Sequence, residues 1–239
     1  MQLSKRLQAV ADFVPPQSRL ADVGTDHAYV PISLAEEKKI TGAIAMDVVD
    51  GPLQRARENI AAHHLETVIE TRKSDGLEAL QPGEADAVVI AGMGGLLICR
   101  ILEQGRKVAA TVRDWVLEPQ SDTDQVRTYL LSHGYTICEE TMVEEDGKFY
   151  PVLKVCTGNG ESGEGECGEP YHPVELLYGR HLLRNRHPVL RRYLEKEIRT
   201  YRKLLENLSR APGDRARARA EEVAKALEMA EQASRIVNR

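Results

Sequence analysis

One stretch of the sequence constrains the fold more than any other, the run RLADVGTDHAY at residues 19–29. The residues before Gly24 are typical of a short buried strand, and helix-compatible residues begin near Tyr29. A strand that passes through a glycine turn into a helix is where a parallel α/β sheet binds a nucleotide-like ligand. The run lacks the second glycine of a dinucleotide fingerprint and has Asp26-His27 there instead. A carboxylate at this turn repels phosphates, so the pattern favours a ligand without a pyrophosphate.

The chain up to residue 157 continues this alternation of strands and helices. Apolar spacing predicts strands near 20–23, 42–47, 67–72, 86–91 and 115–117, and helices over 2–13, 29–39, 52–64, a segment ending near 104, and 122–132. Two further strands, 135–144 and 149–156, flank an Asp-Gly turn signal. Five strand–helix units followed by a hairpin predict an α/β fold, a Rossmann-like doubly wound sheet with a terminal antiparallel hairpin.

The C-terminal third has a different pattern. Apolar residues from Leu194 to Leu208 and from Ala220 to Val237 recur at spacings of three and four, with Pro212-Gly213 between the two runs. Such stripes joined by a short turn predict an antiparallel coiled-coil hairpin. The predicted organisation is a ligand-binding domain at 1–157, a flexible Gly/Glu-rich loop at 158–170 and a basic helical domain at 171–239.

Charge is distributed unevenly along the chain. The net charge is −5, but residues 171–239 carry 16 Lys and Arg against nine Asp and Glu, a net of +7. The segment from Arg180 to Lys203 holds nine of these cations, with Tyr193 and Tyr201 among them. Two interpretations stay open: a solvated helix face, or a surface that follows the phosphates of a nucleic acid.

Cysteine usage and hydropathy indicate the compartment. The four cysteines, Cys99, Cys138, Cys156 and Cys167, contain no C-x-x-C pair, and we expect free thiols in a reducing compartment and no metal site. No run of 18 apolar residues and no signal-peptide pattern occurs, which predicts a soluble cytoplasmic protein. Nothing in the sequence requires an oligomer.

Small and acidic residues follow each predicted parallel strand, where they meet at one edge of the sheet. Asp22 and Gly24 follow the first strand, and Asp47, some 20 residues on, is placed to accept both ribose hydroxyls of a nucleoside. Asp75 can accept a hydrogen bond from an adenine amino group. The turns carry no Lys or Arg to meet phosphates. A cationic nucleoside such as S-adenosylmethionine therefore fits better than NAD, and a nicotinamide oxidoreductase is disfavoured.

Five motifs together, ADVGTDHAY, AMD, KSDGL, AGMGG and LEPQ, resemble the bacterial tRNA adenine-N1 methyltransferases that modify adenine 22. The resemblance covers nearly the whole chain. It implies an S-adenosylmethionine-dependent enzyme with a Rossmann-like domain, a C-terminal coiled coil and tRNA as partner. Glu118 stands in LEPQ where the resemblance leads us to expect Gln, so we assign it no catalytic role. A methyltransferase for another RNA or a small molecule, and a non-catalytic adaptor that binds the cofactor, remain alternatives.

The residues and the resemblance together predict a site. Asp26 and Tyr29 are the predicted catalytic residues. Asp26 is expected to stabilise the charge that develops on the target adenine or to accept its N6 proton, or else only to hold the cofactor. Tyr29 is expected to stack on the everted adenine, or else only to pack at the start of its helix. The predicted cofactor contacts are Asp22, Gly24, Thr25, Asp26, His27, Asp47, Val48, Ser74, Asp75, Gly76, Ala91, Gly92 and Met93. The predicted substrate contacts are Lys5, Arg6, Gly94, Gly95, Arg184, Arg191, Arg192 and Arg199.

Overall fold

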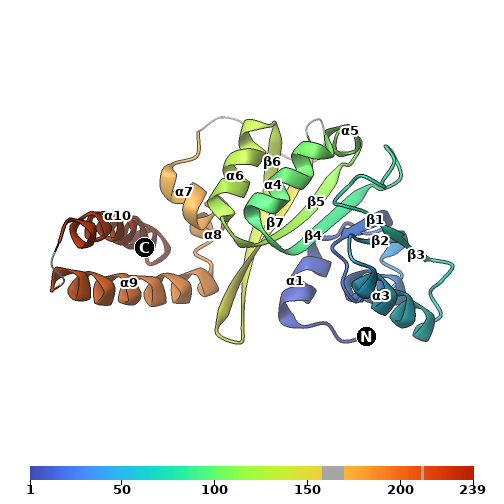
Figure 1. Ribbon diagram of the computed structural model, residues 1–239, viewed down its shortest axis with the longest axis horizontal. Helices are drawn as coiled ribbons and strands as arrows, with labels where there is room; N and C mark the ends of the chain where they lie inside the picture. Colours follow the sequence, from blue (N-terminus) through green and yellow to red (C-terminus); the bar gives the residue numbers. More distant parts are fainter. Residues whose placement is uncertain (158–169, 211–212) are drawn as a thin grey trace. The chain divides into compact units, whose positions relative to one another are not determined.

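The computed structural model describes residues 1–157, 170–210 and 213–239 (Figure 1). The chain divides into two compact units, Met1–Gly168 and Glu169–Arg239, which we call the sheet unit and the helical unit. The predicted Gly/Glu-rich loop lies, apart from its last residue, outside the described residues.

The sheet unit is built on a seven-stranded sheet with the order β3-β2-β1-β4-β5-β7-β6. The first five strands run parallel, β7 pairs antiparallel with β5, and β6 pairs antiparallel with β7. The strands are β1 (Ser18–Val23), β2 (Ile40–Asp47), β3 (Ile69–Lys73), β4 (Ala87–Gly94), β5 (Asp114–Ser121), β6 (Tyr135–Glu145) and β7 (Lys148–Thr157). The predicted doubly wound sheet with a terminal hairpin is confirmed.

Helices cover both faces of this sheet, with α4 and α6 on one side and α1 and α3 on the other (Figure 1). A continuous core of aliphatic side chains lies between the layers. The prediction of five strand–helix units is wrong at one place, because turns and no helix connect β3 to β4. The helices are α1 (Lys5–Phe13), α2 (Tyr29–Glu36), α3 (Asp50–Ala62), α4 (Gly95–Gln104), α5 (Arg106–Ala109) and α6 (Thr123–Ser132).

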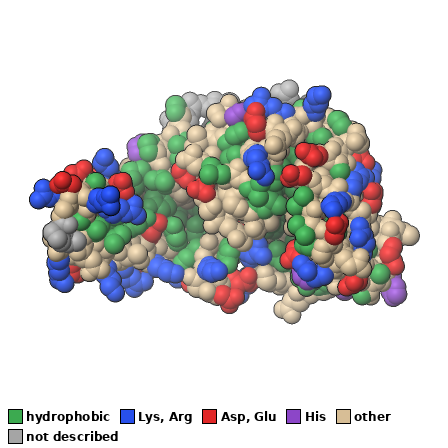
Figure 2. Space-filling model, viewed as in Figure 1, with side chains coloured by type: hydrophobic (Ala, Val, Ile, Leu, Met, Phe, Trp, Pro, Cys, Tyr) green, Lys and Arg blue, Asp and Glu red, His purple; other side chains and the backbone are tan. Residues whose placement is uncertain are grey.

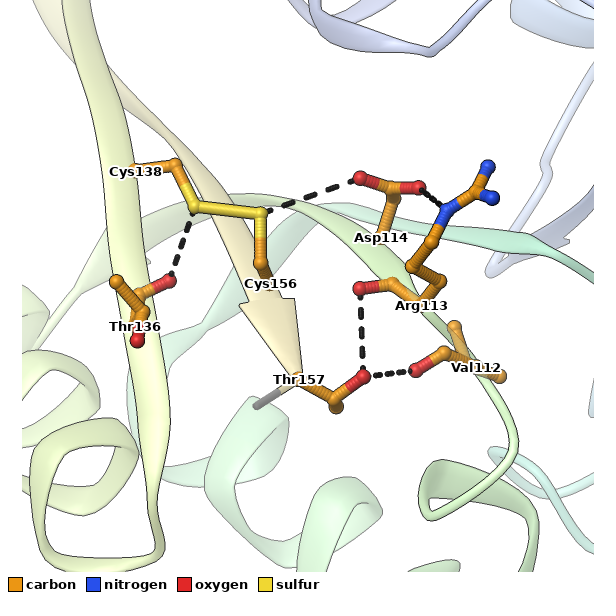
Figure 3. Close-up of a disulfide and its surroundings, with 7 residues drawn as sticks. All are labelled: Val112, Arg113, Asp114, Thr136, Cys138, Cys156 and Thr157. Carbon is orange, nitrogen blue, oxygen red and sulfur yellow. Dashed lines mark hydrogen bonds and ion pairs between the residues drawn. A yellow bond between two sulfur atoms is a disulfide. The ribbon is translucent and has the colours of Figure 1, made fainter. Parts of the chain in front are cut away.

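The terminal hairpin corrects the prediction for two cysteines. Cys138 and Cys156 form a disulfide between β6 and β7, with their Cα atoms 6.5 Å apart (Figure 3). The register of the hairpin shifts at Cys138, which brings this residue beside Cys156. The two cysteines are 18 residues apart in the sequence, and only the antiparallel pairing of the strands brings them together, so their spacing did not indicate a disulfide. Cys99 is a free thiol as predicted, and Cys167 lies outside the described residues.

The helical unit contains α7 (Pro173–Tyr178), α8 (Arg180–Arg184), α9 (Pro188–Ser209) and α10 (Asp214–Val237). The long helices α9 and α10 pack against each other, and the predicted apolar stripes are buried or half-buried along both. Three tyrosine hydroxyls in this unit donate to the single carboxylate of Glu197. Within the described ranges, no helix combines the length and apolar character needed to cross a membrane.

Candidate functional site

The first turn of the sheet depends on a glycine. Gly24 has φ +76°, and the N–H groups of Gly24 and Thr25 both donate to the carbonyl oxygen of Met46, at 2.8 and 2.9 Å. A Cβ atom at Gly24 would overlap the terminal methyl group of Met93. Glycine adopts this left-handed conformation without strain. The turn after β1 therefore lies against the end of β4, as the predicted common edge requires.

Asp22 is a buried acid at the end of β1. Its carboxylate accepts a 2.6 Å hydrogen bond from the Thr25 hydroxyl, and the described residues provide it with no cation. Burial raises the pKa of Asp22 to about 6, with the Thr25 hydrogen bond opposing the shift and the charge of Asp47 contributing to it. A buried carboxyl group next to a second acid favours a positively charged ligand, because a cation offsets the cost of ionising it.

The loop that carries Asp26 and His27 is held by α3. Arg55 on this helix donates to Asp26 at 2.8 Å, and Asn59 donates to the carbonyl oxygen of His27 at 2.9 Å. The His27 and Tyr29 rings stack in parallel with their centroids 4.9 Å apart. These contacts support a structural role for His27, while Tyr29 keeps an exposed ring. The sequence indicated neither Arg55 nor Asn59, because their partners lie some 30 residues away.

The ends of β2 and β3 bring the next predicted residues to the same edge. Asp47 accepts a hydrogen bond from the N–H of Val49 at 2.8 Å through Oδ1. Val48 is 52% exposed beside it. The hydroxyl of Ser74 donates to the Gly76 carbonyl and accepts from the Ala79 N–H, so it closes its own turn. Asp75 is exposed.

The glycine-rich carboxyl end of β4 is the last component of the edge. Gly92 has φ +79°, and its N–H donates to Oε2 of Glu118 at 2.8 Å. Gly94 caps α4, and a Cβ atom at Gly95 would clash with the backbone oxygens of the β5–α6 turn. Ala91 pairs with Glu118 in the neighbouring strand. Close packing against the β5–α6 turn therefore accounts for glycine at position 95, which was predicted as a substrate contact.

Glu118 is a site residue that the sequence did not identify. Its side chain is fully buried within β5, and Oε2 accepts a second hydrogen bond, from Nη1 of Arg6 at 2.8 Å. Burial raises the pKa of Glu118 above its usual range, opposed by Arg6 and by the Gly92 N–H. Oε1 has no partner among the described residues. The only sequence signal was the unexpected acid in LEPQ.

The remaining predicted substrate residues are cations. Lys5 and Arg6 lie on α1, next to the sheet. Arg184 on α8 and the three predicted arginines of α9 are exposed, and Figure 2 shows Lys and Arg side chains gathered over α9 and α10. Arg191 also donates to the carbonyl of Val237, which links α9 to the end of α10. The predicted arginines of α9 are Arg191, Arg192 and Arg199, and the helix carries a fourth, Arg202.

Comparison with known proteins identifies the family. Residues 20–232 match the model of the family TrmK, tRNA (adenine(22)-N(1))-methyltransferase. The tRNA (adenine(22)-N(1))-methyltransferase of Bacillus subtilis (strain 168) is 35% identical over 215 residues, which covers 88% of this chain and 87% of that protein.

The chain belongs to the tRNA (adenine(22)-N(1))-methyltransferase family.

Two solved structures of similar proteins contain a ligand. Streptococcus pneumoniae Sp1610 in complex with S-adenosyl-L-methionine has a TM-score of 0.85 and 34% identity, covering 98% of this chain and 100% of that one. TrmK of M. capricolum in complex with S-adenosyl-homocysteine has a TM-score of 0.84 and 25% identity, covering 99% and 100%. In this member of the TrmK family, the glycine turns, Asp22 and Glu118 all belong to the sheet unit, and the exposed arginines of α8 and α9 belong to the helical unit.

Proposed function

We propose that this chain transfers the methyl group of S-adenosylmethionine to N1 of adenine 22 in tRNA. The observation that carries the proposal is the pair of acids at the carboxyl edge of the sheet, with buried Asp22 close enough to Asp47 for each charge to act on the other. Membership of the TrmK family supports the same reaction and the same substrate.

The residues at the edge fit this cofactor. Asp22 suits the ammonium group of the methionine part, because a cation relieves the cost of a buried carboxylate. Asp47 offers oxygens to the two ribose hydroxyls, and exposed Val48 beside it offers an apolar surface to the adenine. Asp75 is exposed and available to the adenine amino group. The same acids oppose a pyrophosphate, which disfavours NAD.

The chemistry demands little covalent participation from the protein. When bound, the cofactor supplies a methyl sulfonium, a strong electrophile, and adenine N1 already has an in-plane lone pair. The protein therefore contributes mainly by holding the two reactants in line. Asp26 accepts the N6 proton or offsets the positive charge that develops on the base, and Arg55 orients its carboxylate. Tyr29, with its ring exposed, stacks on the everted base.

The helical unit supports a tRNA partner. Residues 171–239 carry a net charge of +7, and exposed arginines concentrate on α8 and α9. Phosphate contacts of this kind supply most of the sequence-independent affinity for nucleic acids. A bacterial tRNA is a cytoplasmic substrate, and we place the chain in that compartment. The structure offers no specific observation for the alternatives, another RNA, a small molecule or an adaptor role.

A pair of transcripts tests the proposal. An unmodified tRNA and the same tRNA with guanine at position 22 are incubated with the chain and methyl-labelled cofactor. We expect label only in the first transcript, and Asp26→Ala is expected to keep the fold and lose most of the transfer. Equal labelling of both transcripts would contradict the proposed position. Absence of label in both, together with binding of NAD and none of S-adenosylhomocysteine, would contradict the proposed reaction.

A further inference from the structure

The ion pair between Arg6 and Glu118 joins two distant parts of the sheet unit. Arg6 lies in the first turn of α1, and Glu118 lies within β5, 112 residues later. The pair lies against the Gly92 turn, since Nη1 of Arg6 is 3.7 Å from the position that a Cβ atom of Gly92 would take. Gly92 lies near the carboxyl end of β4, at the edge assigned above to the cofactor and the target base.

The carboxylate of Glu118 organises this contact through one oxygen. Oε2 accepts both the N–H of Gly92 and Nη1 of Arg6, each at 2.8 Å, while buried Oε1 has no partner among the described residues. A fully buried carboxylate oxygen without a hydrogen bond lowers the stability of a fold, so its presence calls for a functional explanation. Its two bonds fix the backbone of the turn and the position of a guanidinium relative to each other.

Arg6 has further donors in reach of a ligand. A guanidinium carries five N–H groups in a planar fork, and one Arg6 nitrogen bonds to Glu118. The Arg6 side chain is 23% exposed, and its guanidinium carbon lies 5.5 Å from the ring centroid of Tyr150. A guanidinium held on one side by a carboxylate and covered by an aromatic ring presents its remaining N–H groups in a fixed direction. Phosphate oxygens match that fork geometry.

We propose that Glu118 is a positioning residue for methyl transfer, which holds Arg6 against the Gly92 turn so that Arg6 binds the backbone phosphate of the target adenosine. This inference rests on the proposed function, because it needs a polynucleotide whose base reaches the Gly92 turn. A fixed phosphate contact beside the reacting base would orient the nucleotide, and misplacement by a single ångström is costly in such reactions.

The test compares Glu118→Met, which keeps volume and removes the acceptor, with Glu118→Gln, which keeps an oxygen for both donors. For Glu118→Met and for Arg6→Met we expect kcat/KM for tRNA to fall about 10- to 100-fold. We also expect the slope of log affinity against log salt to decrease by about one. Glu118→Gln is expected to recover most of the lost rate, and the double variant Arg6→Met/Glu118→Met to be no worse than either single variant.

The sign of the effect separates positioning from simple electrostatics. Removal of an acid near a polyanion strengthens binding if only net charge matters, so tighter tRNA binding by Glu118→Met would overturn the inference. Multiplying losses in the double variant would also overturn it. If Glu118→Met does not fold, the salt slope of Arg6→Met decides, and an unchanged slope contradicts a phosphate contact.

A buried ion pair elsewhere in the sheet unit supplies the matched control. Arg127 on α6 and Glu140 on β6 are each 1% exposed and bond at 2.8 Å. Glu140→Gln is expected to lower Tm and to leave kcat/KM per folded molecule within about twofold. A loss of activity in Glu140→Gln equal to that in Glu118→Met would reduce Glu118 to a structural role. Failure of the proposed function is distinguishable, because the wild-type chain would then label no tRNA at all.

Discussion

The carboxyl edge of the sheet and the interior of the helical unit differ in how far the hydrogen-bonding capacity of their acidic side chains is used. In the helical unit, partly buried Glu197 accepts hydrogen bonds of 2.8–2.9 Å from the hydroxyls of Tyr178, Tyr193 and Tyr201. At the sheet edge, Asp22 has only the Thr25 hydroxyl, and one oxygen of Glu118 has no partner among the described residues. The helical unit thus satisfies its acid internally, while the edge leaves acceptor capacity for a ligand.

The pKa shifts reflect the same contrast. Burial raises the pKa of Asp22 to about 6, close to neutral pH, so the charge of this group responds to a ligand. In the helical unit, burial and the charge of Glu197 raise the pKa of Tyr201 to about 12, far from physiological pH. Glu197 and its three tyrosines therefore form an internally hydrogen-bonded cluster, and the exposed arginines of this unit are the residues proposed to contact tRNA.

The largest expected effect is at the ribose contact. Asp47→Ala should weaken binding of S-adenosylhomocysteine by about 100-fold or more, because two hydrogen bonds to a charged acceptor, each about 1.5–3 kcal/mol, are lost together. Isothermal titration calorimetry measures this directly. Asp50→Ala is the matched control, since Asp50 is 79% exposed and pairs only with Lys73. A loss below tenfold in Asp47→Ala would contradict hydrogen bonds between the ribose hydroxyls and Asp47.

An intermediate effect is expected from the helical unit. Replacing three of the α9 arginines, Arg191, Arg192 and Arg199, by Gln should lower tRNA affinity about 30-fold at low salt and reduce the salt slope by about three, with unchanged cofactor affinity. Gel-shift titrations at several salt concentrations measure both quantities. The control replaces three exposed arginines of α10 by Gln, Arg215, Arg217 and Arg219. Equal losses in the two triple variants would mean that net charge alone, and no defined surface on α9, attracts the tRNA.

A smaller effect is expected from pH. A cationic ligand prefers ionised Asp22, whose pKa without ligand is about 6. Cofactor affinity should therefore fall by up to about tenfold per pH unit as the pH drops below 6, and level off above 7. Asp22→Asn should bind weakly at every pH, without this dependence. Calorimetry between pH 5 and 8, corrected for protonation of the cofactor, checks the slope; a flat profile in the wild type would contradict the role of Asp22.

The ligand-free protein gives the opposite sign for Asp22. Its folded-state pKa of about 6 exceeds the ordinary value of 3.8, so ionisation between those pH values lowers the free energy of unfolding. Asp22→Asn should consequently stabilise the ligand-free chain at pH 7 by up to about 3 kcal/mol. Urea unfolding at pH 4 and pH 7 measures the difference, and equal stability of the two proteins at pH 7 would show that Asp22 is not strained by burial.

Some contacts of the site are predictable from the sequence and others are not. The turns at Gly24 and Gly92 and the acid at Asp47 were predictable, because parallel strands bring their ends to one edge whatever the side chains between them do. The Arg6–Glu118 pair was not, since 112 residues separate partners that only the packing of α1 brings together. The Cys138–Cys156 pair was missed for the same reason, in a hairpin whose register shifts at Cys138.

The helical unit shows the intermediate case. Tyr193, Glu197 and Tyr201 are spaced at four residues on α9, which indicates side chains on one face of a helix. That spacing indicates the part of the hydrogen-bonded cluster that lies on α9. The remaining tyrosine, Tyr178, lies on α7, so no helical period relates it to Glu197. Local periodicity therefore predicts contacts within one helix, and contacts between elements require the fold.

Mass spectrometry of unmodified tRNA treated with the chain and labelled cofactor tests the reaction most directly. Nuclease digestion followed by fragment sequencing reports the modified base and its position in one measurement. We predict a single added methyl group, on N1 of adenine 22. Methylation of a different nucleotide, methylation at another atom of adenine, or unmodified tRNA after exhaustive incubation would contradict it.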